Sequence, residues 1–310
     1  MKAVRFHSYG DSAVLVYEDA DRPVAGPGQV VVKVAGSAFN PVDAAIRAGL
    51  LTEVFPVALP QIPNFDLAGV ITEVGDGVSG WSAGDAVVAF LPMNGPGAAA
   101  EYATAPADLL AAAPRTVELA DAAALPSSAL TAWQALFEFA GLRAGQRILI
   151  NGAGGAVGGY AVQLAKRAGA TVTATASGRS VGRVRSHRAD QVIDYTSTPL
   201  PAAVAGQRFD VVLNLVRTSP AETAALADLA ADGGVFASTT TPGPDEAGRG
   251  VRTVQVFVRS DAGQLAELTG LVDAGDLKID VGQRRPLADL RAVHDEAAAG
   301  QLPGKTILLP

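Results

Sequence analysis

A cluster of glycines in the middle of the chain could bring the backbone close to a ligand. Residues 147–151, RILIN, are typical of a strand, and residues 158–168 are typical of an amphipathic helix. Between them lie Gly152, Ala153, Gly154, Gly155, Ala156 and Val157. Glycines admit a pyrophosphate, and a helix N-terminus supplies free N–H groups and partial positive charge. The variant Ala153-x-Gly155-x-x-Gly158 therefore favours a dinucleotide site over a purely structural turn.

The residues after the next predicted strand, 171–176, bear on which dinucleotide is bound. NAD sites usually place an Asp or Glu there, whereas this chain has Ser177 and Arg179. A serine can donate a hydrogen bond, and an arginine offers a bidentate fork for a 2′-phosphate. The sequence therefore predicts NADPH, with a solvated arginine at a helix start as the alternative reading of Arg179. Arg183, Arg185 and Arg188 are expected to be surface charges.

Metal chemistry has few candidate ligands in this sequence. The chain has no cysteine, which excludes disulfides, cysteine nucleophiles and thiolate metal sites. His7, His187 and His294 are scattered without ligand spacing and are expected to be ordinary surface or partly buried residues. We therefore expect no metal. Without a Lewis acid to stabilise an alkoxide, a conjugated carbonyl acceptor suits the site better than an alcohol.

The elements that must position these residues fall into two patterns. The first 120 or so residues hold short β-type runs, at 2–6, 30–34, 70–74 and 86–90, which predict a mostly antiparallel β domain. From residue 122 an apolar segment of helical length, 122–140, precedes alternating strands and helices. The later strands are expected at 191–193, 211–215, 235–238 and 254–258, and the alternation predicts a doubly wound parallel sheet. Helices at 262–274 and 287–299 and a strand at 306–309 should pack back on the first domain.

The overall composition argues against some classes of binding partner. The net charge is −7 and the pI is about 5.0, so nucleic acid is an unfavourable partner. The N-terminus reads as a strand rather than a signal peptide, and no apolar window approaches the roughly 18 residues of a membrane span. We expect a cytoplasmic protein with a small-molecule substrate.

Several separate motifs, in order, resemble the zinc-independent quinone oxidoreductase (zeta-crystallin-like) branch of the medium-chain dehydrogenase/reductase superfamily. They cover essentially the whole chain: FNPVD at 39–43 with RAG at 47–49, the block at 63–70, AEY at 100–102, the loop and helix at 149–166, DY at 194–195 and GKTIL at 304–308. The resemblance implies a GroES-like, mostly-β catalytic domain from 1–122 and 261–310, and a Rossmann NADPH-binding domain from 123–260. It also implies a homodimer that pairs through the segment from Val251 to Val258.

The resemblance also implies roles for individual residues. Asn40 and Asp43 would lie beside the nicotinamide, with Asn40 bonding substrate or ribose and Asp43 holding Asn40 or a water, although both residue types also form turns. Further cofactor contacts would come from Thr131, Tyr195, Asn214 and Ser238, although a helix-interior threonine and strand-end polar residues can equally be structural. Phe257 could lie against the cofactor, but a phenylalanine there is more often part of the core.

Departures from the family pattern affect the substrate. Relatives often carry tyrosines where this chain has Ala45, Leu50 and Leu51, so the final proton is expected from water and the pocket wall is expected to be apolar. The function predicted is an NADPH-dependent, zinc-independent hydride transfer to a quinone or α,β-unsaturated carbonyl. The alternatives are an enoyl-thioester reductase and a cofactor-binding sensor or accessory protein with little turnover.

Overall fold

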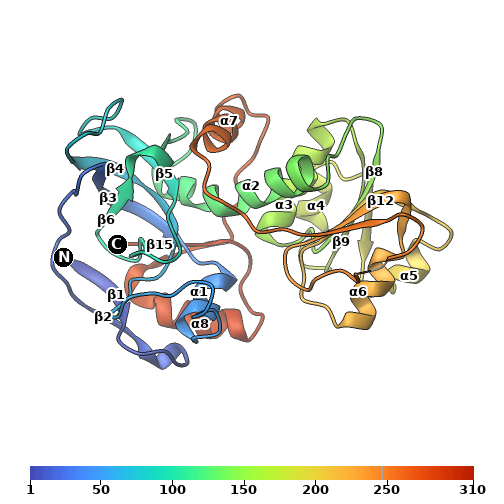
Figure 1. Cartoon of the computed structure of the whole chain (residues 1–310), viewed down its shortest axis with the longest axis horizontal. Helices are drawn as coiled ribbons and strands as arrows, with labels where there is room; N and C mark the ends of the chain where they lie inside the picture. Colours follow the sequence, from blue (N-terminus) through green and yellow to red (C-terminus); the bar gives the residue numbers. More distant parts are fainter. Residues whose placement is uncertain (246) are drawn as a thin grey trace. The chain divides into compact units, whose positions relative to one another are not determined.

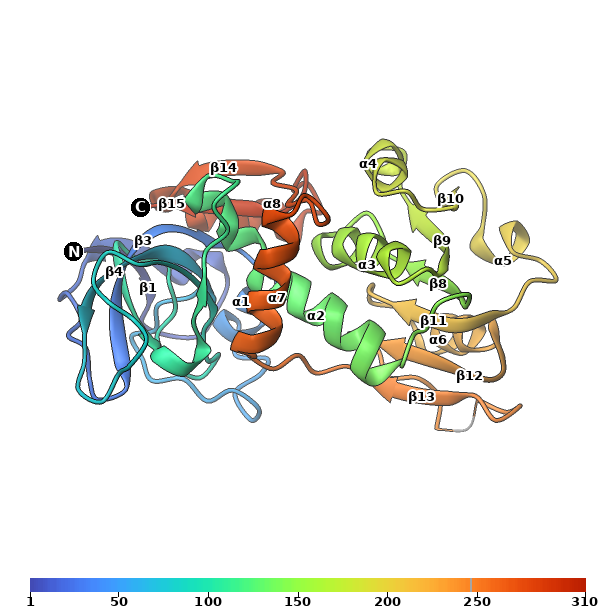
Figure 2. The same ribbon diagram turned by 90° about the horizontal axis from the view of Figure 1, so that it is seen from above.

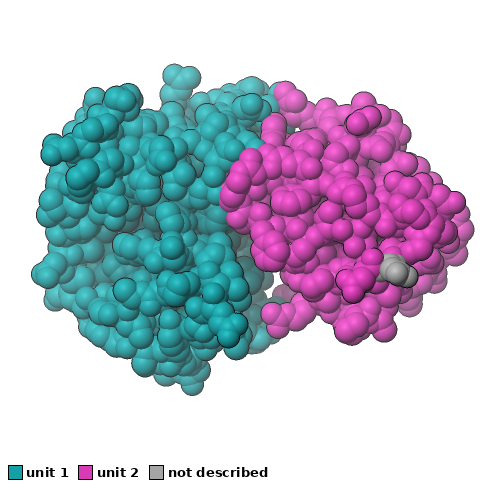
Figure 3. Space-filling view, viewed as in Figure 1, with its two compact units in different colours: residues 1–127, 260–310 teal, residues 128–259 magenta. Residues whose placement is uncertain are grey.

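The computed structural model describes residues 1–245 and 247–310. Its chain divides into one unit formed by Met1–Ser127 with Ser260–Pro310, and a second formed by Ser128–Arg259 (Figure 3). The second unit is therefore one continuous segment inserted between the two parts of the first.

Unit 1 is built on a seven-stranded, largely antiparallel sheet (Figures 1 and 2). Its strand order is β14-β15-β3-β4-β5-β7, and β6 also pairs with β3. The strands are β3 (Gln29–Ala38), β4 (Asp66–Val74), β5 (Ala86–Phe90), β6 (Tyr102–Pro106), β7 (Ala111–Ala112), β14 (Gln283–Pro286) and β15 (Thr306–Leu309). A separate antiparallel pair, β1 (Lys2–Phe6) and β2 (Leu15–Asp19), completes its strands. Valines 30, 31 and 32 of β3 are fully buried, which is why this β-branched run forms a central strand.

The end of the chain is part of this sheet. β15 pairs in parallel with β14 and antiparallel with β3, where Ile307 lies opposite Ala38. Three helices belong to the same unit, namely α1 (Pro41–Arg47), α7 (Ala262–Asp273) and α8 (Leu290–Ala298). The segment after residue 260 therefore packs on the first β domain, as its sequence led us to expect.

Unit 2 is a six-stranded sheet in which every strand pair is parallel, and its order is β10-β9-β8-β11-β12-β13. The strands are β8 (Arg147–Asn151), β9 (Thr171–Ala176), β10 (Gln191–Asp194), β11 (Phe209–Asn214), β12 (Ala230–Ser238) and β13 (Arg252–Gln255). The α-helices that follow β8 in this unit are α3 (Ala156–Arg167), α4 (Val181–Ser186), α5 (Leu200–Ala203) and α6 (Pro220–Ala227). In Figure 1 α3 and α4 lie on one face of the sheet and α6 on the other. This is the doubly wound Rossmann arrangement predicted from the alternation.

Three expectations about local structure are wrong. The segment 122–140 is not one helix: a 3₁₀ helix (Leu119–Ala124), α2 (Pro126–Trp133) and a π-helix (Gln134–Phe139) share it, and Pro126, which has no N–H to donate, marks the first break. The last strand of unit 2, β13, ends at Gln255 rather than at residue 258. Phe257 is not core, because its side chain is 72% exposed.

Candidate functional site

The glycine loop of unit 2 connects β8 to α3, and its glycines are required by close packing. Gly152 has φ +93°, a left-handed conformation that glycine adopts without strain. A Cβ on Gly158 would lie 2.4 Å from the Gly152 carbonyl oxygen and 2.5 Å from the Ala153 Cα. Because backbone atoms cannot move aside, the first turn of α3 can approach the loop only with glycine at 158.

The loop amides divide into those used within the fold and those left for a ligand. Gly152 donates its N–H to Thr175 Oγ1 at 2.9 Å, Ala153 to the Thr175 carbonyl at 3.0 Å and Gly155 to the Gly152 carbonyl at 3.1 Å. Across residues 1–245 and 247–310, no acceptor is found for the N–H groups of Gly154, Ala156 and Val157. Free donors at the N-terminus of a twelve-residue helix fit a pyrophosphate.

The polar residues at the carboxyl ends of the strands bond mainly to one another. Asn151 Nδ2 donates to Asn214 Oδ1 at 2.9 Å, and Thr175 Oγ1 donates to Asn151 Oδ1 at 2.8 Å. Asn214 Nδ2 lies 3.5 Å from Ser238 Oγ, and both residues are fully buried. The structure thus places Asn214 and Ser238 at the carboxyl ends of β11 and β12, where they link the two strands.

The turn after β9 carries the residues predicted to select the cofactor. Ser177 is half-buried and donates its N–H to Ser180 Oγ at 3.2 Å, whereas Arg179 is exposed. Tyr195, 55% exposed, donates its N–H to the Ala176 carbonyl at 3.2 Å, so it borders the same turn. The backbone therefore brings Ser177, Arg179 and Tyr195 to the end of β9.

Arg183 is not the free surface charge that we expected. It is half-buried, and its Nη2 donates to the Gly154 carbonyl in the glycine loop. Arg183 is the third residue of α4, and the sequence alone did not show that this helix packs against the loop.

In unit 1 the start of α1 positions the predicted catalytic residues. Asp43 Oδ2 accepts the N–H of Asn40 at 2.7 Å, and Asp43 Oδ1 accepts the N–H of Asn64 at 3.1 Å. Burial, reinforced by the nearby Asp66 carboxylate, raises the pKa of Asp43 to about 7. Only 1% of Asp43 is exposed, so its carboxylate does not face solvent. It holds the backbone at Asn40 and at Asn64 instead.

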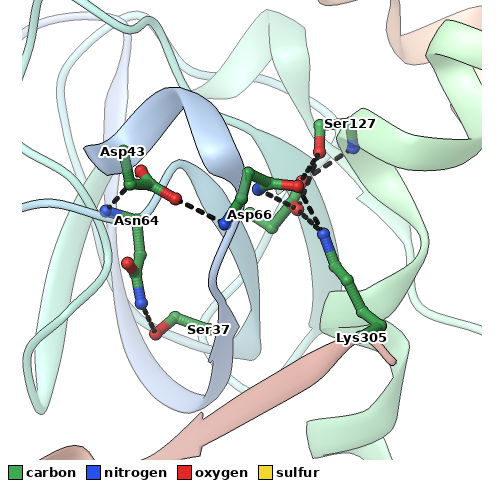
Figure 4. A network of polar contacts seen from close by, with 7 residues as sticks. Ser37, Asp43, Asn64, Asp66, Ser127 and Lys305 are labelled. Atoms are coloured by element: carbon green, nitrogen blue, oxygen red, sulfur yellow. Dashed lines mark hydrogen bonds and ion pairs between the residues drawn. The ribbon is translucent and has the colours of Figure 1, made fainter. Parts of the chain in front are cut away.

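Asp66, Ser127 and Lys305 form a buried polar network (Figure 4), and hydrogen bonds from Asn40 Nδ2 to Asp66 and from Lys305 to Asn40 Oδ1 make the Asn40 side chain part of it. Asp66 Oδ2 accepts from Asn40 Nδ2 at 2.9 Å, from Ser127 Oγ at 2.8 Å and from Lys305 Nζ at 2.9 Å. Asp66 Oδ1 accepts the N–H of Ser127 at 2.7 Å, at the start of α2. Lys305 Nζ also donates to Asn40 Oδ1 at 2.6 Å. The Lys305–Asp66 ion pair is almost completely buried, with side-chain exposures of 3% and 0%.

These charges fix the orientation of the Asn40 amide. An ammonium group can only donate and a carboxylate can only accept, so Oδ1 must face Lys305 and Nδ2 must face Asp66. Nδ2 has two N–H groups, and Asp66 accepts from one of them, so the second is left for another acceptor. The half-buried Asn40 can therefore present a single, oriented donor to a carbonyl or hydroxyl oxygen.

Sequence reasoning missed Asp66, Ser127 and Lys305 as site residues. Asp66 and Lys305 lie inside the motifs at 63–70 and 304–308, so their positions in these motifs could have drawn attention to them. Nothing in the sequence indicated that the two residues form a pair. Thr131 lies on the part of α2 that belongs to unit 2 and is half-buried.

The described part of the chain contains no group of three or more His, Cys, Asp or Glu residues that could hold a metal ion. His7 Nε2 lies 2.7 Å from Glu18 Oε1 on an exposed surface. His187 and His294 are 5% and 2% exposed. The expectation that the histidines lie at the surface or only partly buried therefore holds for His7 and is wrong for the other two.

Comparison with protein families matches both parts of the chain. Residues 26–115 match the alcohol dehydrogenase GroES-like domain, and residues 187–308 match the model described as zinc-binding dehydrogenase. That model's name refers to zinc, whereas this chain has no cysteine.

One relative matches the chain from end to end, and another matches more than two thirds of it. It is 36% identical over 328 residues to a chloroplast envelope quinone oxidoreductase homolog of Arabidopsis thaliana, with 100% of this chain and 98% of the relative covered. A chloroplastic NADPH-dependent alkenal/one oxidoreductase of the same plant is 39% identical over 228 residues, which covers 70% of this chain and 57% of the relative.

Solved structures agree on the fold. An NAD-dependent alcohol dehydrogenase superposes with a TM-score of 0.90 at 28% identity, and the match covers 100% of both chains. A mycobacterial protein solved in complex with NADPH superposes with a TM-score of 0.87 at 26% identity, again over 100% of both chains. The two neighbours differ in the nicotinamide that their names specify.

Proposed function

The chain belongs to the zinc-independent quinone oxidoreductase branch of the medium-chain dehydrogenase/reductase superfamily, and from that premise we propose that it uses NADPH to reduce a quinone or an α,β-unsaturated carbonyl compound. The observation that carries the proposal is the set of free amides at Gly154, Ala156 and Val157, at the N-terminus of α3. They supply uncommitted donors where a dinucleotide pyrophosphate needs them. When bound, the nicotinamide supplies the hydride.

The choice of NADPH rests on the turn after β9. It carries Ser177 and Arg179 and has no carboxylate for the ribose hydroxyls. Arginine matches a phosphate with two parallel hydrogen bonds, which an unmodified ribose cannot use. The alkenal/one oxidoreductase named as NADPH-dependent and the NADPH complex favour the same choice, whereas the NAD-dependent neighbour argues for a direct test.

The substrate end is assigned to Asn40. Its one remaining Nδ2 N–H would bond the carbonyl oxygen on which negative charge gathers as hydride adds to the distal carbon. Asp66 and Lys305 act through Asn40 by holding its side-chain amide in one orientation. Asp43 acts by accepting the backbone N–H of Asn40. Leu50, 74% exposed, and Leu51 supply apolar side chains after α1 at positions where relatives often carry tyrosines, so the proton is assigned to water.

The test is a substrate panel with purified protein. NADPH and NADH oxidation are followed against 2-alkenals, enones, quinones and acyl-thioesters, with and without added zinc. We expect turnover with NADPH on the first three classes, a loss of the NADPH preference in Arg179→Ala and a fall of about 10²-fold in kcat in Asn40→Ala, because one oriented donor is removed. A protein that binds neither nucleotide contradicts the proposal. Turnover on acyl-thioesters alone, or tight NADPH binding without turnover, would favour the enoyl-thioester reductase or the sensor.

We also propose a homodimer through the edge of the unit 2 sheet. β13 ends the strand order there, and Phe257, just beyond it, is 72% exposed in the segment from Val251 to Val258. An unpaired edge strand is an aggregation risk unless it is covered, and pairing with a second copy covers it. Sedimentation of wild type and Val254→Pro tests this, and a monomeric wild type would contradict it.

Among the described residues no helix combines the length and apolarity needed to cross a membrane. A cytoplasmic location stays a prediction from the sequence.

A further inference from the structure

Arg183 on α4 is held in an unusual environment. Its Nη2 donates to the Gly154 carbonyl, and within residues 1–245 and 247–310 no carboxylate pairs with it. A guanidinium has five N–H donors, so a single bond to a neutral carbonyl leaves most of the fork unused. The side chain is half-buried, which restricts where those remaining donors can point.

Gly154 also brings the glycine loop into contact with the turn after β9. A Cβ on Gly154 would lie 2.3 Å from Ser180 Oγ, so the loop and the turn are in direct contact. Ser180 is 8% exposed, and its Oγ accepts the Ser177 N–H at 3.2 Å. Arg183 and Ser180 therefore both contact the glycine loop at Gly154, and Ser180 in turn bonds Ser177.

The segment that follows β9 carries positive charges and no negative ones. Residues 177–189 contain four arginines and no Asp or Glu. A bond to a charged acceptor is about twice as strong as one to a neutral carbonyl, so a phosphate dianion is the acceptor that this fork favours. A purely structural tie to Gly154 would need only one N–H, which a lysine could supply.

We propose that Arg183 is a specificity-determining residue that recognises the 2′-phosphate of NADPH. One N–H anchors the guanidinium on the Gly154 carbonyl, and the rest of the fork binds the phosphate together with Ser177 and Arg179. The anchoring bond keeps the arginine at the edge of the glycine loop before the cofactor arrives, so little side-chain freedom is lost on binding. This inference rests on the proposed function, since it assumes that the site takes a pyridine dinucleotide.

The test is calorimetric binding of NADPH and NADH, which differ only at the 2′ position, to the full chain. In Arg183→Met we expect NADPH affinity to fall at least tenfold, equivalent to about 1.4 kcal/mol, while NADH affinity stays within about twofold. Arg183→Lys should fall between wild type and Arg183→Met, because it keeps the charge and loses the fork. Arg185→Met is the matched control, since it removes the same charge from an exposed position on α4 and should change neither affinity.

The outcomes separate this inference from the function beneath it. Equal losses of NADPH and NADH in Arg183→Met would show that Arg183 only shapes the glycine loop, and would overturn the assignment. No change, or a similar change in Arg185→Met, would overturn it as well. A wild-type protein that binds neither nucleotide would instead refute the proposed function. Melting temperatures of the variants identify any that fail to fold.

Discussion

Replacing Lys305 with methionine tests the buried network around Asn40. Methionine keeps most of the length and the apolar stem but removes the ammonium that lies 2.9 Å from Asp66 Oδ2 and 2.6 Å from Asn40 Oδ1. The variant leaves a carboxylate that has no exposed surface without the lysine that pairs with it. We expect a strong loss of stability in unit 1.

The magnitude follows from the contacts. At 2.9 Å and an effective dielectric constant of about 20, the gross attraction is about 6 kcal/mol. Breaking a buried pair by removing one partner costs about 3 to 5 kcal/mol. Asp66 keeps three donors, from Asn40 Nδ2 and from the N–H and Oγ of Ser127, so we expect about 3 kcal/mol. That is a large part of the roughly 5 to 15 kcal/mol by which domains are stable.

Two tryptophans make the assay selective. Trp81 lies in unit 1, where its Nε1 donates to the Ala107 carbonyl at 3.1 Å, and Trp133 lies in unit 2. In a Trp133→Phe background the fluorescence of Trp81 reports urea unfolding of unit 1 alone. With an m-value of about 1 to 3 kcal/mol/M, the midpoint should fall by about 1 to 3 M.

Lys278→Met is the control for this measurement. Its side chain is 72% exposed and lies 3.9 Å from Asp280, so its loss should cost about 1 kcal/mol or less. If Lys305→Met is no more destabilised than Lys278→Met, the network does not stabilise the unit and the reasoning about Asn40 fails with it.

Three further outcomes follow from buried groups and tight glycines. Burial, with Arg47 nearby, lowers the pKa of His294 to about 3, and neither ring nitrogen has a partner in the described chain. The neutral ring thus stabilises unit 1 above pH 6.5 and loses that effect as pH falls toward 3, so His294→Leu should shift the acid midpoint downward without loss at pH 7. Because the folded pKa of Asp43 is raised to about 7, stability in the His294→Leu background should fall as pH rises from about 4 to 7, and a flat urea midpoint would contradict this. Gly158→Ala should abolish dinucleotide binding, whereas Gly182→Ala in α4, with nothing within 4 Å of the added Cβ, should leave it intact in the same titration.

Elements with strong local signals were predictable from the sequence. The strands Ala86–Phe90, Arg147–Asn151, Thr171–Ala176 and Thr306–Leu309 have the predicted ends, because each apolar run is bounded by turn residues or by the neighbouring loop. The glycine loop was equally visible. Which of its amides are free was not, because that depends on Thr175 of the neighbouring strand, whose hydroxyl and carbonyl take two of them.

The polar network could not be predicted, because its members are far apart in the sequence. Lys305 and Asp66 are separated by 239 residues, and Ser127 and Asp66 by 61. A single lysine or aspartate beside an apolar strand normally reads as a surface residue. Only the pairing of β15 with β3 and the start of α2 above Asp66 turn these residues into one buried cluster.

The place of β15 in the unit 1 sheet also has a consequence for biosynthesis. β15 lies between β14 and β3, so the first sheet lacks two of its strands until residues 283–309 have been translated. Residues 128–259 form one uninterrupted segment with its own core. During translation the later-made unit can therefore complete its fold first, while the strands that emerge earliest wait for the end of the chain. Folding in this sequence would reverse the usual order, in which the N-terminal domain folds first.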